Sequence, residues 1–218
     1  MNQNLKDIKI SDNLGSFLVK LARKTVYEHF RYKPQFILPE CEDKQLHEKM
    51  GAFVTIQTYP ERELRGCIGY PLPYKELIIA VKENALNAAF EDPRFEPLNK
   101  SELEKIIFEV TVLTKPEEIK YANSKELVEC IEIGKHGLIV QHGFFSGLLL
   151  PQVPVEYNWN IEEFLSHTCE KAGLPYNYWK NNKLSWKRFE GIVFEEETPE
   201  GNVKKKILNI RYLKNESE

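Results

Sequence analysis

The sequence predicts an α+β fold in which mixed or antiparallel sheets carry flanking helices. Helical and strand-like patterns interleave along the chain without strict strand-helix-strand alternation, and short turns join several neighbouring strands. A length of 218 residues is enough for one large domain or two small ones. We therefore expect a single domain over residues 1–218, which can divide into two subdomains in contact at a boundary that the sequence leaves open.

The composition is that of a globular protein with balanced charge. The formal net charge is −3, from 30 basic and 33 acidic residues, and 42% of the residues are hydrophobic. This balance argues against disorder and against a protein that wraps a polyanion. No apolar run approaches the length of a transmembrane helix, and Met1 to Lys9 is too polar for a signal peptide.

The four cysteines lie far apart and form no C-x-x-C pair, which is typical of free thiols in a reducing compartment. We therefore expect a cytoplasmic protein that does not interact with membranes.

Four segments carry the signals of helices. The first begins with Ser11 and Asp12 as caps, and the last begins with Asn160 followed by Glu163, the signature of a capping box. Apolar residues recur at helical spacing within them. The expected helices are 11–30, 77–89, a short helix from 124, and a long helix from 160 that ends before Gly173.

Six segments have the β-branched or alternating pattern of strands. Two of them are separated by residues 141–145, which have the length and composition of a hairpin loop. Residues 32–49 are expected to form an irregular connection, and 199–202 a turn. The expected strands are 51–59, 106–114, 137–140, 146–150, 188–196 and 206–213.

The most informative segment for function is Arg65-Gly66-Cys67-Ile68-Gly69. Gly66 and Gly69 permit positive φ and close backbone approach, so a loop here can present a thiol beside N–H groups that bind an anion. Arg65 would favour the thiolate. The alternative is that Cys67 is a small buried residue at a tight strand exit.

A second candidate segment is Asp92-Pro93-Arg94-Phe95, after the second expected helix. Its rigid turn can place Arg94 to clamp a carboxylate or a phosphate. Alternatively, Asp92 only turns the chain and Arg94 is its local salt-bridge partner.

Together these segments resemble the AMMECR family. The resemblance rests on Leu64-Arg65-Gly66-Cys67-Ile68-Gly69 with Ala89-Phe90-Glu91-Asp92-Pro93-Arg94-Phe95, and it covers nearly the whole chain, about residues 14–212. One departure is Tyr70, where the family commonly has a small Thr or Ser; a phenol here can narrow a cleft or supply a polar contact. Later segments agree in the same order: 134–140, 148–153, Glu156, Trp159, and 164–173 with Lys171.

The resemblance implies a compact α+β protein with two packed subdomains, in which the arginine-glycine-cysteine loop lines a cleft. The family occurs in archaea, bacteria and eukaryotes, and its biochemical activity is not established. Bacterial relatives are often encoded beside Memo-type and radical-SAM proteins, an association that carries no mechanism.

A thiol nucleophile at Cys67 would need a base, and two residues are candidates. His136 and Glu156 each lie near glycine or proline turns that can face a cleft. Glu156 is also supported by the family resemblance. For His136 the alternative is a solvent-exposed turn residue.

No metal and no cofactor is expected. Cys67, Cys130, His136 and His142 lack the spacing of a zinc site, and phosphate-loop and dinucleotide fingerprints are absent. Aromatic and basic residues interleave over 176–188, as on a surface that stacks bases, but the balanced charge argues against nucleic acid as a partner. We favour the alternative that these aromatic residues pack a small subdomain.

Two main functional hypotheses follow, and the sequence predicts no oligomeric state. In the first, a cytosolic enzyme acts on a small anionic metabolite or an acidic side chain, with Cys67 as nucleophile or redox thiol and with Arg65 and Arg94 binding the anion. Glycine N–H groups would stabilise negative charge, and Glu156 or His136 would move the proton. In the second, a non-catalytic binding or adaptor module holds a metabolite or a protein partner, such as a Memo-like or radical-SAM protein.

Overall fold

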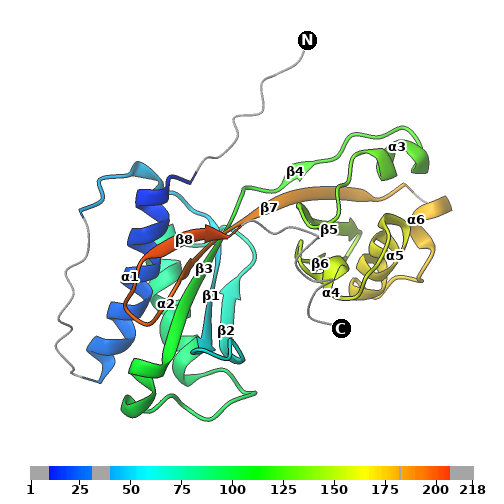
Figure 1. Cartoon of the computed structure of the whole chain (residues 1–218). Helices are drawn as coiled ribbons and strands as arrows, with labels where there is room; N and C mark the ends of the chain where they lie inside the picture. Colours follow the sequence, from blue (N-terminus) through cyan, green and yellow to red (C-terminus); the bar gives the residue numbers. More distant parts are fainter. Residues whose placement is uncertain (1–9, 31–39, 182, 207–218) are drawn as a thin grey trace. The chain divides into compact units, whose positions relative to one another are not determined.

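The computed structural model describes residues 10–30, 40–181 and 183–206 (Figure 1). Six strand pairs are antiparallel and helices flank the sheet, so the predicted α+β fold is confirmed. Within these ranges no helix combines the length and apolar character needed to cross a bilayer. The elements are α1 (Asp12–His29), η1 (Lys44–His47), β1 (Gly51–Thr58), β2 (Leu64–Tyr70), α2 (Leu77–Phe90), η2 (Lys100–Lys105), β3 (Ile106–Leu113), β4 (Glu117–Glu118), α3 (Ser124–Glu129), β5 (His136–His142), β6 (Phe145–Leu149), α4 (Val153–Glu156), α5 (Ile161–Lys171), α6 (Tyr178–Asn181), β7 (Ser185–Glu196) and β8 (Val203–Lys206).

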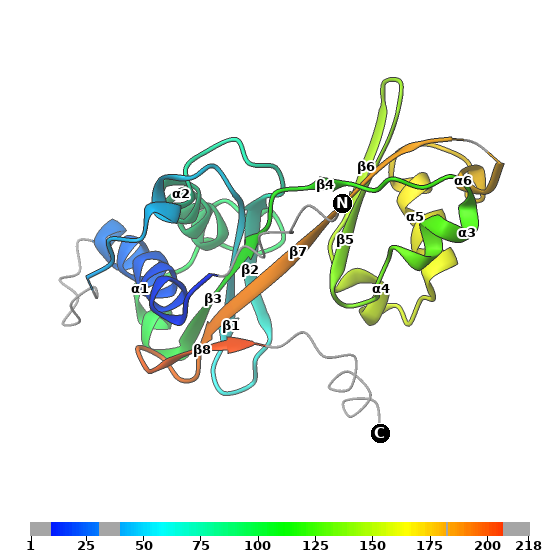
Figure 2. The ribbon, with the colours of Figure 1, turned by 90° about the horizontal axis from the view of Figure 1, so that it is seen from above.

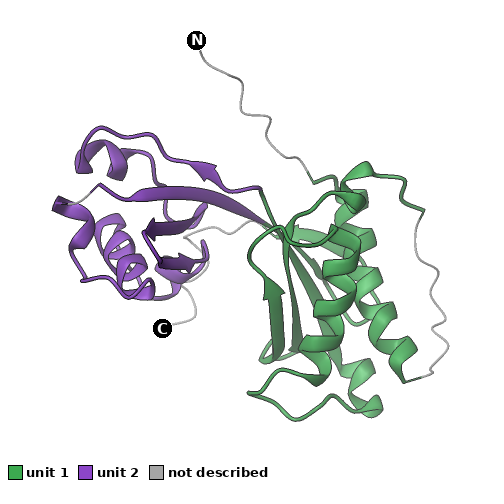
Figure 3. Ribbon diagram, turned by 180° about the vertical axis from the view of Figure 1, so that it is seen from behind, with its two compact units in different colours: residues 1–114, 192–206 green, residues 115–191, 207–218 purple. Residues whose placement is uncertain are grey.

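The chain divides into two compact units (Figure 3). Unit 1 contains the described residues of Met1–Thr114 and of Ile192–Lys206, and unit 2 contains those of Lys115–Gly191. Strand β7 therefore begins in unit 2 and ends in unit 1. Because one boundary falls inside a strand, no Pro-, Gly- or Ser-rich linker marks it in the sequence.

In unit 1, α1 and α2 cover one face of a sheet with the order β2-β1-β3, followed by the end of β7 and by β8 (Figure 2). Successive side chains of β1 and β3 point alternately to this helix-covered face and to the opposite one, which we call the open face; Ile107 and Leu113 on the open face are also buried. The helix-facing side chains are completely buried. Because side chains alternate along a strand, the residues between them point to the open face. The helix-facing residues are Ala52, Val54, Ile56, Phe108, Val110 and Val112.

A buried ion pair joins α1 to β7 in this core. Arg23 Nε and Nη2 donate to the two carboxylate oxygens of Glu196, at 2.6 and 2.5 Å. Arg23 also donates to the carbonyls of Leu103 and Ile106, and Glu196 accepts the N–H of Phe108. Both side chains are only 1% exposed, so each charge depends on the other for its compensation.

In unit 2, β4, the beginning of β7, β5 and β6 form a sheet in that order, and α5 packs beside β5 and β6 (Figure 2). The core contains Trp186 of β7 and Phe164 of α5, both fully buried. Gly147 of β6 allows the close approach of α5, since a Cβ there would lie 2.5 Å from the backbone nitrogen of Ala172.

Most of the predicted elements are confirmed, with changes at their ends. The hairpin turn is only Gly143-Phe144, because β5 and β6 extend into the predicted loop; Gly143 has φ 58°, as a tight hairpin turn requires. The predicted strand at 206–213 starts too late, since β8 begins at Val203 and includes Lys206; residues 207–213 lie outside the described part. Of the predicted irregular connection 32–49, residues 40–49 are described and contain the short helix η1.

Candidate functional site

Cys67 lies in a strand, which corrects the prediction of a loop. Strand β2 pairs with β1, and Cys67 is directly opposite Thr55. The two glycines in this segment weaken its β propensity, and only the pairing with β1 makes it a strand.

The motif glycines serve close packing and do not adopt positive φ. A Cβ on Gly66 would lie 2.1 Å from the carbonyl oxygen of Ala88 in α2, and a Cβ on Gly69 would lie 2.2 Å from the ring of Phe53. The expected close backbone approach is therefore present, and it brings β2 against α2.

Arg65 is the extra residue of a β-bulge. Ile56 pairs with Gly66 and Gln57 pairs with Leu64, so Arg65 has no partner in β1. Its guanidinium reaches η2, where Nε donates to Glu102 Oε1 at 2.7 Å and Nη2 donates to Oε2 at 3.2 Å. Burial alone would raise the pKa of Glu102, but the hydrogen bonds from Arg65 and from the N–H of Asn99 lower it.

Asp92 and Arg94 hold the outer edge of β2 at Cys67. Asp92 Oδ2 accepts the Cys67 N–H at 2.8 Å, and Arg94 Nη2 donates to the Cys67 carbonyl at 3.2 Å. The two side chains also form the expected salt bridge, with Nε to Oδ1 at 2.9 Å and Nη2 to Oδ2 at 2.7 Å. Together they supply the hydrogen bonds that a neighbouring strand would give to this residue.

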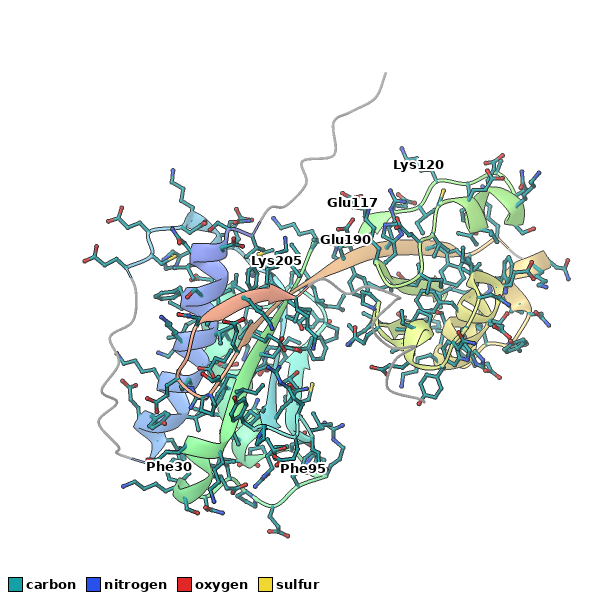
Figure 4. All side chains as sticks on the ribbon, viewed as in Figure 1. Phe30, Phe95, Glu117, Lys120, Glu190 and Lys205 are labelled. Carbon is teal, nitrogen blue, oxygen red and sulfur yellow. The ribbon has the colours of Figure 1, made fainter. Side chains whose placement is uncertain are left out.

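Phe95, labelled in Figure 4, lies near both guanidinium groups. Its ring centroid is 6.0 Å from Arg65 Cζ and 5.5 Å from Arg94 Cζ, within the range of cation–π attraction. The Arg94 side chain is 53% exposed and that of Arg65 is 16% exposed. Within the described residues, the Nη1 group of neither arginine donates to a protein acceptor.

The Cys67 thiol is half-buried on the open face, and Thr55 Oγ1 donates to its Sγ at 3.3 Å. Burial raises the pKa of this thiol; Thr55 and Arg94 only partly offset the rise, and Glu109 and Asp92 add to it. The thiol is therefore neutral at pH 7. Its backbone N–H is also engaged by Asp92, which removes it as a donor to an incoming anion.

Tyr70, the departure from the family pattern, makes a polar contact within unit 1. Its hydroxyl donates to Glu83 Oε2 at 3.0 Å, and Lys75 Nζ contacts the same carboxylate oxygen. Of the two roles expected for this phenol, the polar contact is present.

The predicted bases His136 and Glu156 belong to unit 2, whereas Cys67 belongs to unit 1. His136 is 6% exposed at the start of β5, so the alternative of an exposed turn residue is wrong. Its Nδ1 accepts the N–H of Glu132 at 3.0 Å, and burial, with the charges of Arg188 and Lys135, lowers the pKa of His136 to about 4. Glu156 ends α4, where desolvation raises its carboxyl pKa.

Two tryptophans in the aromatic and basic segment 176–188 pack the core of unit 2, as the favoured interpretation predicted. Trp179 and Trp186 are buried, and Trp179 Nε1 donates to Ser166 at 2.8 Å. Among residues 10–30, 40–181 and 183–206, no three His, Cys, Asp or Glu side chains cluster as a metal site requires.

Sequence reasoning missed three residues around Cys67: Thr55, Glu102 and Glu109. Glu109 offers a sequence signal, because it is the charged residue in the apolar strand Ile106–Leu113. Glu102 offers another, since it completes a capping box with Asn99. Neither signal indicates which side chain Glu102 or Glu109 contacts, because those contacts depend on the tertiary structure.

Comparison with known proteins gives one consistent result. The AMMECR1 family model matches residues 19–194. Protein MK0488 of Methanopyrus kandleri is 50% identical over 92% of this chain and 97% of its own length, and Protein MJ0810 of Methanocaldococcus jannaschii is 48% identical over 89% and 96%. The crystal structure of the uncharacterized protein PH0010 from Pyrococcus horikoshii is similar with a TM-score of 0.75 and 44% identity, covering 91% of this chain and 98% of that one. The resemblance seen in the sequence is thus confirmed, and the chain belongs to the AMMECR1 family, whose members matched here have no established biochemical function.

Proposed function

We propose that this protein is a binding module that holds a carboxylate or phosphate group of a small molecule or protein partner at Arg65 and Arg94. The observation that carries the proposal is the arrangement of the two guanidinium groups near Phe95, each fixed in place by a bidentate carboxylate. Fixed, planar donors lose little conformational entropy when they bind an anion.

The paired carboxylates do not consume all donors of the arginines. Asp92 and Glu102 engage Nε and Nη2, and Nη1 is left with two N–H groups on each side chain. Arg94 is the more exposed of the two and would make the first contact with an anion. Because each guanidinium is already neutralised by its partner, we expect weak binding that depends on hydrogen-bond geometry more than on net charge.

The surroundings of Cys67 support binding over covalent catalysis. A reactive thiol requires an environment that lowers its pKa, whereas burial raises that of Cys67. In the binding module the thiol forms no covalent bond, and the clamp on the Cys67 backbone keeps β2 rigid beside Arg65.

The test is a titration of the ¹⁵N-labelled protein with inorganic phosphate and, separately, with acetate, at constant ionic strength. We expect saturable shifts of the Nε–Hε resonances of Arg94 and Arg65. Arg62 is the matched internal control, because it is also a partly exposed arginine paired with a carboxylate, Glu195, at 2.9 Å. Equal shifts at Arg62 would show that the anion only screens charge, and would contradict the proposal.

Two variants separate this hypothesis from the thiol enzyme. Arg94→Lys keeps the charge but loses the planar fork, and should weaken phosphate binding about tenfold, the effect of losing ~1.5 kcal/mol of charged hydrogen bonding. Cys67→Ser should leave phosphate affinity unchanged. Unaltered binding by Arg94→Lys would rule out the proposed site.

A further inference from the structure

The open face of unit 1 carries a second group of polar side chains, which belong to β1, β2 and β3. We call Thr55, Gln57, Cys67 and Glu109 the open-face cluster. Thr55 is directly opposite Cys67 in β2 and directly opposite Glu109 in β3, and Gln57 lies two residues from Thr55 on the same side of β1. Directly opposed residues have Cβ atoms about 5 Å apart, so three strands contribute to one continuous polar row.

Hydrogen-bond acceptors outnumber donors in this cluster. The Thr55 hydroxyl donates its hydrogen bond to Cys67 Sγ, so its oxygen lone pairs can still accept a hydrogen bond. Among the described residues, Glu109, whose side chain is only 14% exposed, forms one salt bridge, with Lys206 Nζ at 3.3 Å from Oε2. Lys206 also lies 3.5 Å from Glu195, so one ammonium is shared between two carboxylates.

Gln57 supplies an independent observation. Its Oε1 is shielded from solvent and accepts no hydrogen bond from any described residue. A buried acceptor without a donor costs about 1–3 kcal/mol and is rare in folded proteins. Gln57 as a whole is only half-buried, so rotation of its carboxamide can turn the carbonyl toward the surface.

We infer that the open-face cluster is a binding site for a ligand nitrogen that carries N–H donors, with Gln57 Oε1 and the Glu109 carboxyl as its acceptors. Thr55 Oγ1 and the neutral Cys67 Sγ line the same row as weaker acceptors. An amide and an ammonium group share this chemistry. The burial that raises the pKa of Glu109 favours a neutral amide, and the negative charge of an ionised Glu109 favours an ammonium. This site does not depend on the proposed anion site, since it uses different side chains and the opposite type of ligand.

The test uses acetamide and methylammonium chloride as probes, titrated into the ¹⁵N-labelled full chain, with sodium chloride as the salt control. We expect saturable shifts of the Gln57 side-chain NH₂ and of the Cys67 amide with at least one probe. Gln141, an exposed glutamine of β5 in unit 2, is the internal control and should not shift. Glu109→Gln should abolish the response to methylammonium and retain any response to acetamide.

A variant at the acceptor completes the experiment. Gln57→Leu should lose the probe-induced shift of Cys67, and Thr55→Val should weaken it, in case the leucine variant does not fold. The inference is overturned if neither probe shifts Gln57, if Gln141 responds equally, or if Gln57→Leu binds as the native protein does. The phosphate titration at Arg65 and Arg94 is read from other resonances, so failure of one site is distinguishable from failure of the other.

Discussion

Asp92 Oδ2 accepts the backbone N–H of Cys67 at 2.8 Å, and Arg94 returns a hydrogen bond to the carbonyl of that same residue at 3.2 Å. The two most informative motifs of the sequence therefore meet through hydrogen bonds to the backbone of the cysteine. The clamp explains why an acidic and a basic residue follow α2 so closely, and it accounts for the ordered outer edge of β2.

Asp92→Asn tests the clamp. The guanidinium of Arg94 and the N–H of Cys67 hold the pKa of Asp92 well below its ordinary value. A depressed pKa in the folded state gives stability that is complete above about pH 4, the unfolded value, and is lost as the pH falls below it. We expect the variant to lose about 1–3 kcal/mol of unfolding free energy at pH 7, measured in urea, with the difference shrinking in acid. A difference that stayed constant down to pH 2 would contradict an ionised Asp92 in this role.

Alkylation of Cys67 tests the state of the thiol. Because burial raises its pKa, the midpoint of its reaction with iodoacetamide should lie above about 8.5, the value of an unperturbed thiol. Peptide mass spectrometry of the folded protein, with the urea-unfolded protein as control, gives the rate at each pH. Rapid labelling with a midpoint below that value would restore the thiol enzyme as the leading hypothesis.

His136→Asn tests the buried imidazole. The folded pKa of about 4 is depressed, so the native protein should lose stability as the pH falls from about 6.5 to 4, while the unfolded chain takes up a proton. Asparagine can still accept the N–H of Glu132 but does not titrate, and should flatten this pH dependence. His142→Asn is the matched control, because it makes the same substitution at an exposed position of the same strand. Equal profiles for both variants would show that His136 does not cause the loss.

Arg23 and Glu196 test the core of unit 1. Removing one partner leaves a buried charge uncompensated, so Glu196→Met or Arg23→Met should cost about 3–5 kcal/mol of unfolding free energy. The double variant with Met at both positions should cost less than the sum of the single variants, because no charge is left behind. Additive losses in urea denaturation would mean that the two side chains act independently.

Gly66→Ala tests the close packing of β2. The new Cβ would meet the carbonyl oxygen of Ala88 at 2.1 Å, a backbone atom that cannot move without shifting α2, and should cost about 1–3 kcal/mol or more. Gly143→Ala is the matched control: it has φ 58° but nothing within 4 Å, so its cost is confined to about 1 kcal/mol of backbone strain. Thermal unfolding of both variants compares the clash with the strain, and a smaller loss at Gly66 would contradict the packing argument.

The sequence by itself determined the elements whose signals are local. Helix α5 is an example, because Asn160 and Glu163 form its capping box within one turn. The hairpin of β5 and β6 is another, since Gly143 sets its turn. The family could also be recognised from the two motifs and their order along the chain, which are features of the sequence alone.

Only the tertiary structure decided which side chains meet. Strand β2 was missed because its glycines suit a loop as well as a strand, and pairing with β1 is a contact between distant segments. Arg65 pairs with Glu102, 37 residues away, because a bulge turns it toward η2, and Thr55 aligns Cys67 with Glu109 through the register of three strands. Hydrophobic periodicity predicts which face of a strand is buried, but strand register and β-bulges depend on packing along whole strands. Register and the bulge at Arg65 determine which side chains surround Cys67.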